Sequence, residues 1–216
     1  MITLRPHQTR GVDALQQHDK GQVLIPTGGG KTLIAIMDAK RQVDTQPSTI
    51  VVVCPRILLA EQLCSEYLEV IDNTDVHVLH VHTGETIHYS STRPNDIHLF
   101  TNVARSEGES VLIFTTYHSL HRIQEADVEV NTIYFDEAHN SVQRHFFPAT
   151  EYFSQEADRA YFFTATRKTS VTVNKPGMND QEVYGDIICR VSAPELVEGK
   201  YIAPPKVHVK EFDIHN

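Results

Sequence analysis

The chain has 216 residues, 40% of them hydrophobic and 22% charged, which is the composition of a globular α/β protein with room for one sizeable core. No apolar run approaches the roughly 20 residues that a membrane helix needs, and the first residues lack the order of a signal peptide, so we expect a cytoplasmic protein without membrane contact. The formal net charge of −9 argues against a surface that binds phosphates over its whole extent, but it is compatible with a narrow nucleic-acid track.

Short β-rich runs alternate with helical stretches, which predicts an α/β fold with a mainly parallel sheet and helices on both faces. The first half is predicted to contain helices over residues 5–18, 31–43 and 56–71, and strands over 22–26, 50–54 and 77–81. Pro6 stands in the first turn of the first helix, where proline is favoured. The strand 50–54 is almost purely β-branched, as expected for a strand buried on both faces.

The second half is predicted to contain strands over 111–115, 132–135, 160–164 and 187–191, and helices over 92–108 and 117–125. We interpret 92–108 as a helix because its apolar residues repeat at helical spacing and Gly108 can end it. Ser192 and Glu195 have the spacing of a capping box. They predict a short helix that Gly199 closes.

The segment from Ile25 to Thr32 joins a predicted strand to a predicted helix and contains three consecutive glycines. Glycines let the backbone curl so that successive N–H groups point at an anion, and the following helix adds its positive N-terminal end. Lys31 is placed to reach the β- and γ-phosphates, and Thr32 offers a hydroxyl to Mg²⁺. Ile25 stands where the general phosphate-loop pattern has glycine. The predicted nucleotide-binding residues of this loop are Thr27, Gly28, Gly29, Gly30, Lys31 and Thr32.

The tetrapeptide Asp-Glu-Ala-His at 136–139 follows the predicted strand 132–135. A carboxylate at the tip of a buried strand can hold Mg²⁺ through its water shell, and a second carboxylate beside it can orient and deprotonate the attacking water. We therefore predict that Asp136 serves the metal and that Glu137 is the general base. This strand is expected to lie next to the strand that leads into the phosphate loop.

Further segments carry weaker signals, each compatible with an ordinary loop or strand end when taken alone. Thr164 and Thr166 end a predicted strand, and their hydroxyls could bond to the 136–139 segment. Gln8 opens the first helix, where it could pair with the edge of adenine. Two other strand ends carry groups that could contact a nucleic-acid backbone, namely Pro55, Arg56, Thr115, Thr116 and Tyr117.

Cysteine and histidine patterns predict no metal site beyond the magnesium site. The three cysteines lie far apart and form no CxxC pair, so we expect buried, reduced thiols. Among the 13 histidines, His77, His80 and His82 lie close together in the sequence. No carboxylate or cysteine is placed in the sequence to complete a recognisable site around them.

Together these motifs resemble a known family. Their order along the chain is that of the motifs in the first motor domain of superfamily 2 helicases: 5–8, 26–32, 55–56, 115–117, 136–139 and 164–166. The chain is most similar to the DEAH-type branch that includes restriction-enzyme motor subunits and phage recombination helicases, and the resemblance covers essentially its whole length. It implies a RecA-like fold, ATP and Mg²⁺ as cofactors, and DNA in preference to RNA as partner.

The resemblance also implies residue roles. Gln8 and Arg5 would serve adenine, while His139, Thr164 and Thr166 would couple the nucleotide state to the nucleic-acid track. Arg167 departs from the family, which often has proline there.

The same resemblance implies a partner domain, because the family's arginine fingers come from a second motor domain. We therefore expect residues 1–203 to form the first RecA-like domain and 204–216 to be the exit segment toward a second one in the parent protein. The pattern of residues 207–212 itself indicates either an edge strand or the exit of the domain. The chain alone should then hydrolyse ATP very poorly.

Two other functions were weighed against an ATP-driven motor. A P-loop kinase would need an acceptor pocket and a lid, and the sequence has no signature of either. A nucleotide-dependent nucleic-acid or protein remodelling module of the same fold, which does not unwind, stays open as the alternative. Stimulation of ATP hydrolysis by polynucleotide separates the motor from this module.

Overall fold

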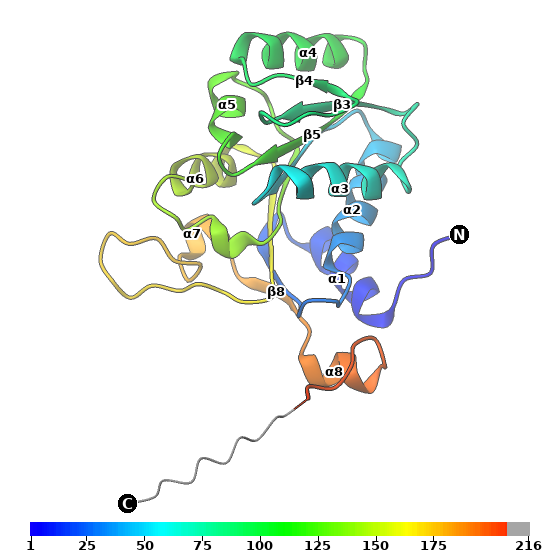
Figure 1. The fold of residues 1–216 in the computed structure, drawn as a ribbon, viewed down its shortest axis with the longest axis vertical. Coiled ribbons are helices and arrows are strands. Elements are labelled where there is room, and N and C mark those ends of the chain that lie inside the picture. Colours follow the sequence, from blue (N-terminus) through cyan, green and yellow to red (C-terminus); the bar gives the residue numbers. More distant parts are fainter. Residues whose placement is uncertain (207–216) are drawn as a thin grey trace, which may run out of the picture.

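All strands of the structure lie in one parallel sheet. The computed structural model describes residues 1–206, and its eight strands follow the order β4-β3-β5-β2-β6-β7-β1-β8. Every neighbouring pair of strands is parallel. Figure 1 shows helices on both sides of this sheet. The predicted α/β class with a mainly parallel sheet is confirmed.

The strands are short, as is usual for a sheet buried on both faces. They are β1 (Lys20–Leu24), β2 (Thr49–Cys54), β3 (Val76–Val81), β4 (Tyr89–Ser90), β5 (Ser110–Thr116), β6 (Thr132–Phe135), β7 (Arg159–Thr164) and β8 (Ile187–Arg190). In β2, Ile50 and Val52 face one side of the sheet while Val51 and Val53 face the other, and all four are buried.

The helices cover the two faces of the sheet. They are α1 (Pro6–Gln17), α2 (Lys31–Thr45), α3 (Ile57–Leu68), α4 (Pro94–Ser106), α5 (Leu120–Glu125), the 3-10 helix η1 (Ala138–Asn140), α6 (Phe147–Glu156), α7 (Gln181–Tyr184) and α8 (Ala193–Glu198). Residues of α1, α2, α3 and α8 share one hydrophobic core, and residues of α4, α5, α6 and α7 share the other. None of the helices within residues 1–206 is long and apolar enough to cross a membrane.

The predicted elements agree with the observed ones to within a few residues, with four omissions. The strand β4, the 3-10 helix η1, the helix α6 and the short helix α7 were not predicted. β4 has two residues and α7 has four, which is too short for a periodic signal. The predicted short helix after Ser192 is present as α8, and the Ser192 side chain accepts a hydrogen bond from the Glu195 amide. The predicted strand over 207–212 lies outside the described residues.

The expected position of β6 beside the phosphate-loop strand is wrong. β7 lies between them, pairing Ala160 with Lys20 of β1 on one side and with Ile133 of β6 on the other. The sequence pattern does not show this, because a crossover connection can insert a later strand between two earlier ones. The phosphate loop and the 136–139 segment therefore follow strands separated by β7.

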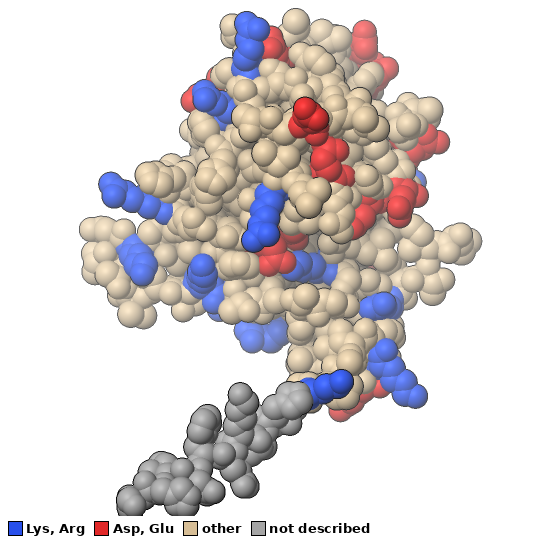
Figure 2. Space-filling model, viewed as in Figure 1, with Lys and Arg blue, Asp and Glu red and all other residues tan. Residues whose placement is uncertain are grey.

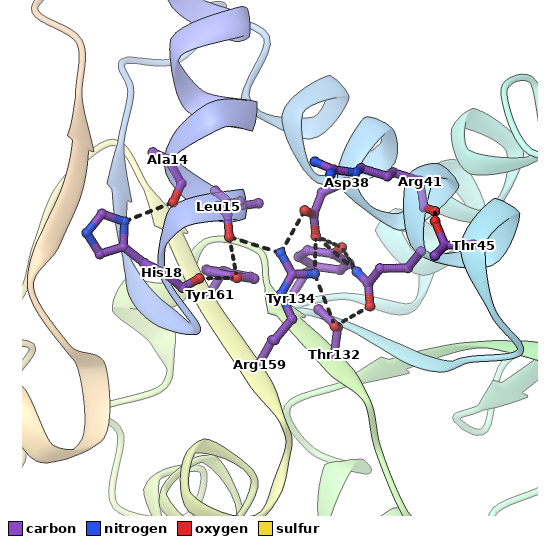
Figure 3. Close-up of polar contacts among 11 residues, drawn as sticks. Ala14, Leu15, His18, Asp38, Arg41, Thr45, Thr132, Tyr134, Arg159 and Tyr161 are labelled. Atoms are coloured by element: carbon purple, nitrogen blue, oxygen red, sulfur yellow. Dashed lines mark hydrogen bonds and ion pairs between the residues drawn. The ribbon is translucent and has the colours of Figure 1, made fainter.

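A buried polar network holds the amino-terminal ends of β6 and β7 against the helices α1 and α2 (Figure 3). Arg159, the first residue of β7, forms a bidentate ion pair with Asp38 of α2 at 2.8 and 2.9 Å. Its guanidinium also donates to the Leu15 carbonyl in α1 at 3.0 Å. Tyr134 of β6 donates its hydroxyl to Asp38. The network joins α1 and α2 to β6 and β7. It lies at the amino ends of these two strands, while the candidate site residues follow their carboxyl ends.

Candidate nucleotide site and nucleic-acid groove

The phosphate loop runs from the end of β1 to the start of α2, and its conformation requires glycine. Gly28 and Gly30 have φ values of +83° and +78°, in the left-handed region that side chains disfavour. At Gly29 a Cβ atom would lie 2.3 Å from the Cγ2 atom of Ile25. Each of the three glycines is therefore needed for the curled loop. Lys31 begins α2 directly after it.

The start of α1 holds this loop in place. The Gln8 side chain donates to the Gly30 carbonyl at 3.1 Å and accepts from the Arg5 amide at 2.9 Å. The His7 Nε2 atom lies 2.6 Å from the Gly29 carbonyl oxygen. Gln8 thus contacts the loop through Gly30, and its adenine role stays a prediction. His7 was not predicted, although its place beside Gln8 in the first helical turn was a usable signal.

The segment after α8 packs against the start of α1 and the phosphate loop. The Arg5 guanidinium lies 4.7 Å from the centre of the Tyr201 ring, and the His7 ring meets that ring edge-on at 5.3 Å. A Cβ atom on Gly28 would lie 3.3 Å from Ile202. Arg5 therefore interacts with an aromatic face in this structure. The sequence carried no local signal for the contact, because nearly the whole chain separates the two residues.

The acidic pair follows β6 on a sharp turn. Glu137 has a φ of +47°, and the Asp136 amide donates to the Val53 carbonyl of β2 at 2.8 Å. Burial raises the pKa of Asp136 to about 6, against the lowering effect of the Lys31 ammonium. Lys31 itself forms an ion pair with Glu137. The structure thus brings the lysine of the phosphate loop and both predicted carboxylates together.

His139 extends these contacts to β7. Its Nδ1 atom lies 2.9 Å from the Thr164 hydroxyl and 3.5 Å from the Glu137 carboxylate. Burial lowers the pKa of His139, and the Glu137 charge opposes that shift. The Thr164 hydroxyl also bonds the backbone of Thr166, at 3.1 and 3.2 Å. The three residues predicted to couple the sites are therefore connected to one another and to Glu137.

The residues of the expected nucleic-acid track differ in how accessible they are. Arg56 is exposed after β2, but Thr115 and Tyr117 at the end of β5 are 0% and 2% exposed. The Tyr117 ring packs against Phe146, and its hydroxyl donates to the Asp136 carbonyl at 2.7 Å. The side chains of Thr115 and Tyr117 are therefore not accessible to a nucleic acid in this structure. Hydrophobic packing of the strand end, which the motif does not reveal, buries both.

Two neighbouring cavities beyond the carboxyl ends of β2 and β5 form a groove. One, of about 630 Å³, is lined by Arg56, Glu137 and His139 among others, and the second, of about 470 Å³, is lined by Thr116, Thr83 and Arg122 among others. Pro55 and His118 line both. The groove thus runs from Glu137 past the predicted residues Pro55 and Arg56 to Thr116, which is 4% exposed. His118, His121 and Arg122 line it as well, and they were not predicted.

Charge is unevenly distributed over the surface. On the face drawn in Figure 2, Lys and Arg side chains lie mainly on the left and lower part, while Asp and Glu side chains lie mainly toward the upper right. The net charge of −9 is therefore an average over regions of different sign. Local positive groups such as Arg56 remain accessible to an anionic partner.

The chain matches the family described as Type III restriction enzyme, res subunit, over residues 1–169. It belongs to that family. A search of curated protein sequences found no match to this chain.

Solved structures share the fold of this chain. The nuclease-deletion mutant of the Type ISP restriction-modification enzyme LlaGI, in complex with a DNA substrate mimic, is 20% identical with a TM-score of 0.77 over 93% of this chain and 21% of its own. The ATP-dependent Type ISP enzyme LlaBIII bound to DNA is 19% identical, with a TM-score of 0.73 over 92% of this chain and 16% of its own.

The Hef helicase domain of Pyrococcus furiosus is 16% identical, with a TM-score of 0.62 over 89% of this chain and 40% of its own. The chain thus spans less than half of the length of each of these three proteins. Its fold is that of the first RecA-like motor domain of superfamily 2 helicases, as the order of its motifs predicted.

Proposed function

We propose that this chain is the ATP-binding motor domain of a DNA-dependent ATPase, in which Mg-ATP hydrolysis drives translocation on DNA. The observation that carries the proposal is a continuous set of contacts from Lys31 through Glu137 and His139 to Thr164. These contacts join the phosphate loop to the wall of the groove. A nucleotide-binding module without a nucleic-acid partner has no need of the link.

In this proposal the loop amides and Lys31 bind the β- and γ-phosphates of ATP. The loop is already curled and α1 already supports it, so little ordering cost is added when the nucleotide arrives. Gln8 and Arg5 stand beside the loop to serve the adenine base. Gln8 would exchange one of its present hydrogen bonds for one to adenine, so nucleotide binding would alter its contact with Gly30.

Thr32 and Asp136 would hold Mg²⁺. A hydroxyl and a carboxylate are hard oxygen donors of the kind that Mg²⁺ binds. Burial raises the pKa of Asp136 to about 6, and a nearby cation would stabilise the charged form of this carboxyl group. Bound there, the metal would supply charge neutralisation to the phosphates. Glu137, released from Lys31 by the phosphates, would orient the attacking water and accept its proton.

DNA would lie along the groove that begins at Glu137 and passes Arg56 and His118. His139, Thr164 and Thr166 would transmit a change at the γ-phosphate to this wall, because they bond to one another across η1 and β7. We favour DNA over RNA because the similar enzymes LlaGI and LlaBIII are described in complexes with a DNA substrate mimic and with DNA.

A second RecA-like domain of the natural full-length protein would complete the site with an arginine finger. Arg167, the arginine next to the Thr164–Thr166 segment, donates to the Met178 carbonyl at 3.0 Å and is held in its own loop. Arg56 lies in the groove. Neither is placed as a finger aimed at the γ-phosphate.

The test is steady-state ATP hydrolysis by the natural full-length protein with no nucleic acid, with single-stranded and duplex DNA, and with the matching RNAs. We expect DNA to stimulate hydrolysis, and a triplex-displacement assay to show movement along duplex DNA. Hydrolysis that no polynucleotide stimulates would refute the motor and favour the remodelling module instead. Stimulation by RNA alone would keep the motor but reverse the choice of partner.

A further inference from the structure

Away from the nucleotide site, five potential metal ligands converge at the edge of the sheet that carries β3 and β4. Glu61 and Cys64 come from α3, His80 and His82 from β3 and the residue after it, and His88 from the residue before β4. Cys64, His80 and His82 are buried, with exposed fractions of 2%, 0% and 3%. The 77–82 histidines alone gave no reason to expect a site, because the cysteine and the carboxylate come from a helix that packs on them.

One triad has the composition of a zinc site. Single ligand atoms of Cys64, His80 and His88 all lie within 4.8 Å of one another. Ligand atoms around a tetrahedral Zn²⁺ ion stand about 3.3–3.8 Å apart, as follows from bond lengths of about 2.0–2.3 Å. Small rotations of the side chains therefore bring the three atoms to bonding distance. The rings of His80 and His88 are already stacked, with centres 5.5 Å apart.

Two buried polar atoms of the cluster lack a hydrogen-bond partner among the described residues. They are Nε2 of His80 and Oε1 of Glu61, two of only four such atoms in residues 1–206. A buried polar atom without a partner is destabilising, so native proteins usually satisfy it with a protein group, a water or an ion. Both atoms being in one cluster points to a ligand at this place.

The hydrogen bonds of His82 explain why both atoms are unpartnered. The Gly84 amide donates to Nδ1 of His82 at 3.0 Å, so a neutral His82 carries its proton on Nε2. That proton points at Nδ1 of His80, 2.9 Å away, which leaves the His80 proton on Nε2. A metal ion at Nε2 requires that the proton move to Nδ1. The two rings must then turn apart, because Nδ1 of His80 and Nε2 of His82 both carry protons. Each proton can be donated to Oε1 of Glu61, now 3.5 Å from Nδ1 of His80 and 3.9 Å from Nε2 of His82.

We propose that Cys64, His80 and His88 bind one Zn²⁺ ion through the Cys64 thiolate, Nε2 of His80 and a ring nitrogen of His88, with water as the fourth ligand. Binding releases the Cys64 thiol proton to solvent and shifts the His80 proton from Nε2 to Nδ1. Glu61 orients the His80 ring from behind by accepting its Nδ1 proton, in the arrangement usual for metal-bound histidines. One ion thereby satisfies both buried atoms.

The site has a structural consequence for the groove. It ties α3 to residues 82–89, and His82 and Thr83 line the 470 Å³ cavity. Zinc bound here fixes that wall of the groove without touching the phosphate loop, Asp136 or Glu137. The site is independent of the proposed ATPase, so either can fail without the other.

Cobalt substitution tests the site directly. The chain is stripped of metal with a chelator and titrated with Co²⁺, and absorption is recorded from the near ultraviolet to the red. We expect one equivalent to produce tetrahedral d–d bands and a thiolate-to-cobalt charge-transfer band, both abolished by added Zn²⁺. Cys64→Ser should remove the charge-transfer band, and His88→Ala should weaken Co²⁺ binding at least tenfold.

Two matched variants serve as controls. Cys189→Ser removes another buried cysteine, and His77→Ala removes an exposed β3 histidine that forms a separate cluster with Glu107 and Glu109. Both should keep the full spectrum. Absence of a charge-transfer band in the unmodified chain, or its survival in Cys64→Ser, would overturn the proposal.

Thermal unfolding keeps the test decisive if Cys64→Ser does not fold. His88 is only half-buried in a connecting segment, so His88→Ala should unfold at the same temperature as the unmodified chain when both are metal-free. Zn²⁺ at about a hundredfold excess over its Kd should raise Tm by roughly 5–10 °C for the unmodified chain and leave His88→Ala unchanged. Equal shifts for both proteins would refute the site.

Discussion

The Lys31 ammonium group forms an ion pair with the Glu137 carboxylate, although 106 residues separate them in the sequence. Their side chains are 12% and 31% exposed, so the contact is largely shielded from water. In the proposed cycle this pair must open, because the phosphates need the cation and the water needs the base. Nucleotide binding would then itself activate Glu137.

Lys31→Ala should therefore weaken nucleotide binding. A charge-assisted hydrogen bond contributes about 1.5–3 kcal/mol, so the Kd for ATP should rise roughly 10- to 100-fold. Titration with a fluorescent ATP analogue measures this directly. Lys40→Ala is the matched control, since Lys40 lies on the same helix in an exposed pair with Asp44 and should leave Kd unchanged. An unaltered Kd in Lys31→Ala would refute its phosphate role.

Glu137→Gln should bind ATP nearly as well as the unmodified protein but hydrolyse it about 10²–10⁴ times more slowly, because an amide cannot accept the proton of the attacking water. Single-turnover hydrolysis by the natural full-length protein separates the two effects. Glu129→Gln changes an exposed carboxylate paired with Arg105 and should have no effect. Hydrolysis by Glu137→Gln at the normal rate would assign the base elsewhere.

Arg56→Ala should reduce DNA affinity and lower the slope of log K against log salt by about one, as expected for loss of one phosphate contact. Tyr117→Phe should leave DNA affinity unchanged at every salt concentration, since its ring is buried and its hydroxyl bonds Asp136. Fluorescence anisotropy over a salt series distinguishes them. Equal losses of affinity in both variants would show that the groove residues act through folding.

Asp38→Ala should lower the free energy of unfolding by about 3 kcal/mol, because it leaves the Arg159 guanidinium without its partner in a largely buried place. Urea denaturation followed by circular dichroism measures the change. Asp44→Ala removes an exposed pair and should cost no more than about 0.5 kcal/mol. Similar values for the two variants would mean that the network in Figure 3 contributes little to stability.

The 216-residue chain alone should bind ATP but hydrolyse it about 10³–10⁵ times more slowly than the natural full-length protein, the factor that an arginine finger contributes in related systems. Steady-state hydrolysis of both with saturating Mg²⁺ and DNA provides the comparison. Equal turnover would show that Arg167 or another arginine of this chain completes the site.

The residues of the proposed nucleotide site could be named from the sequence because they are contiguous: the 25–32 loop and the 136–139 tetrapeptide each consist of a few adjacent residues. Periodicity likewise predicted most helices and strands. What could not be predicted depends on contacts between distant segments. The Tyr117 ring is buried by Phe146, Arg5 meets Tyr201, and Cys64 reaches His80 only because α3 packs on β3. None of these contacts produces a periodic or local pattern in the sequence.

Because β7 lies between β6 and β1, its position limits where the chain can tolerate insertions and deletions. Strands lie about 4.8 Å apart, so β7 sets a spacing of about 10 Å between the phosphate-loop strand and the strand of the acidic pair. One residue inserted into β7 would turn Thr164 to the other face of the sheet and shift it by about 3.3 Å, separating it from His139. The exposed residues near Val171 and Val173 carry no such constraint. Length variation should therefore be confined to the loop after β7 and excluded from the strand itself.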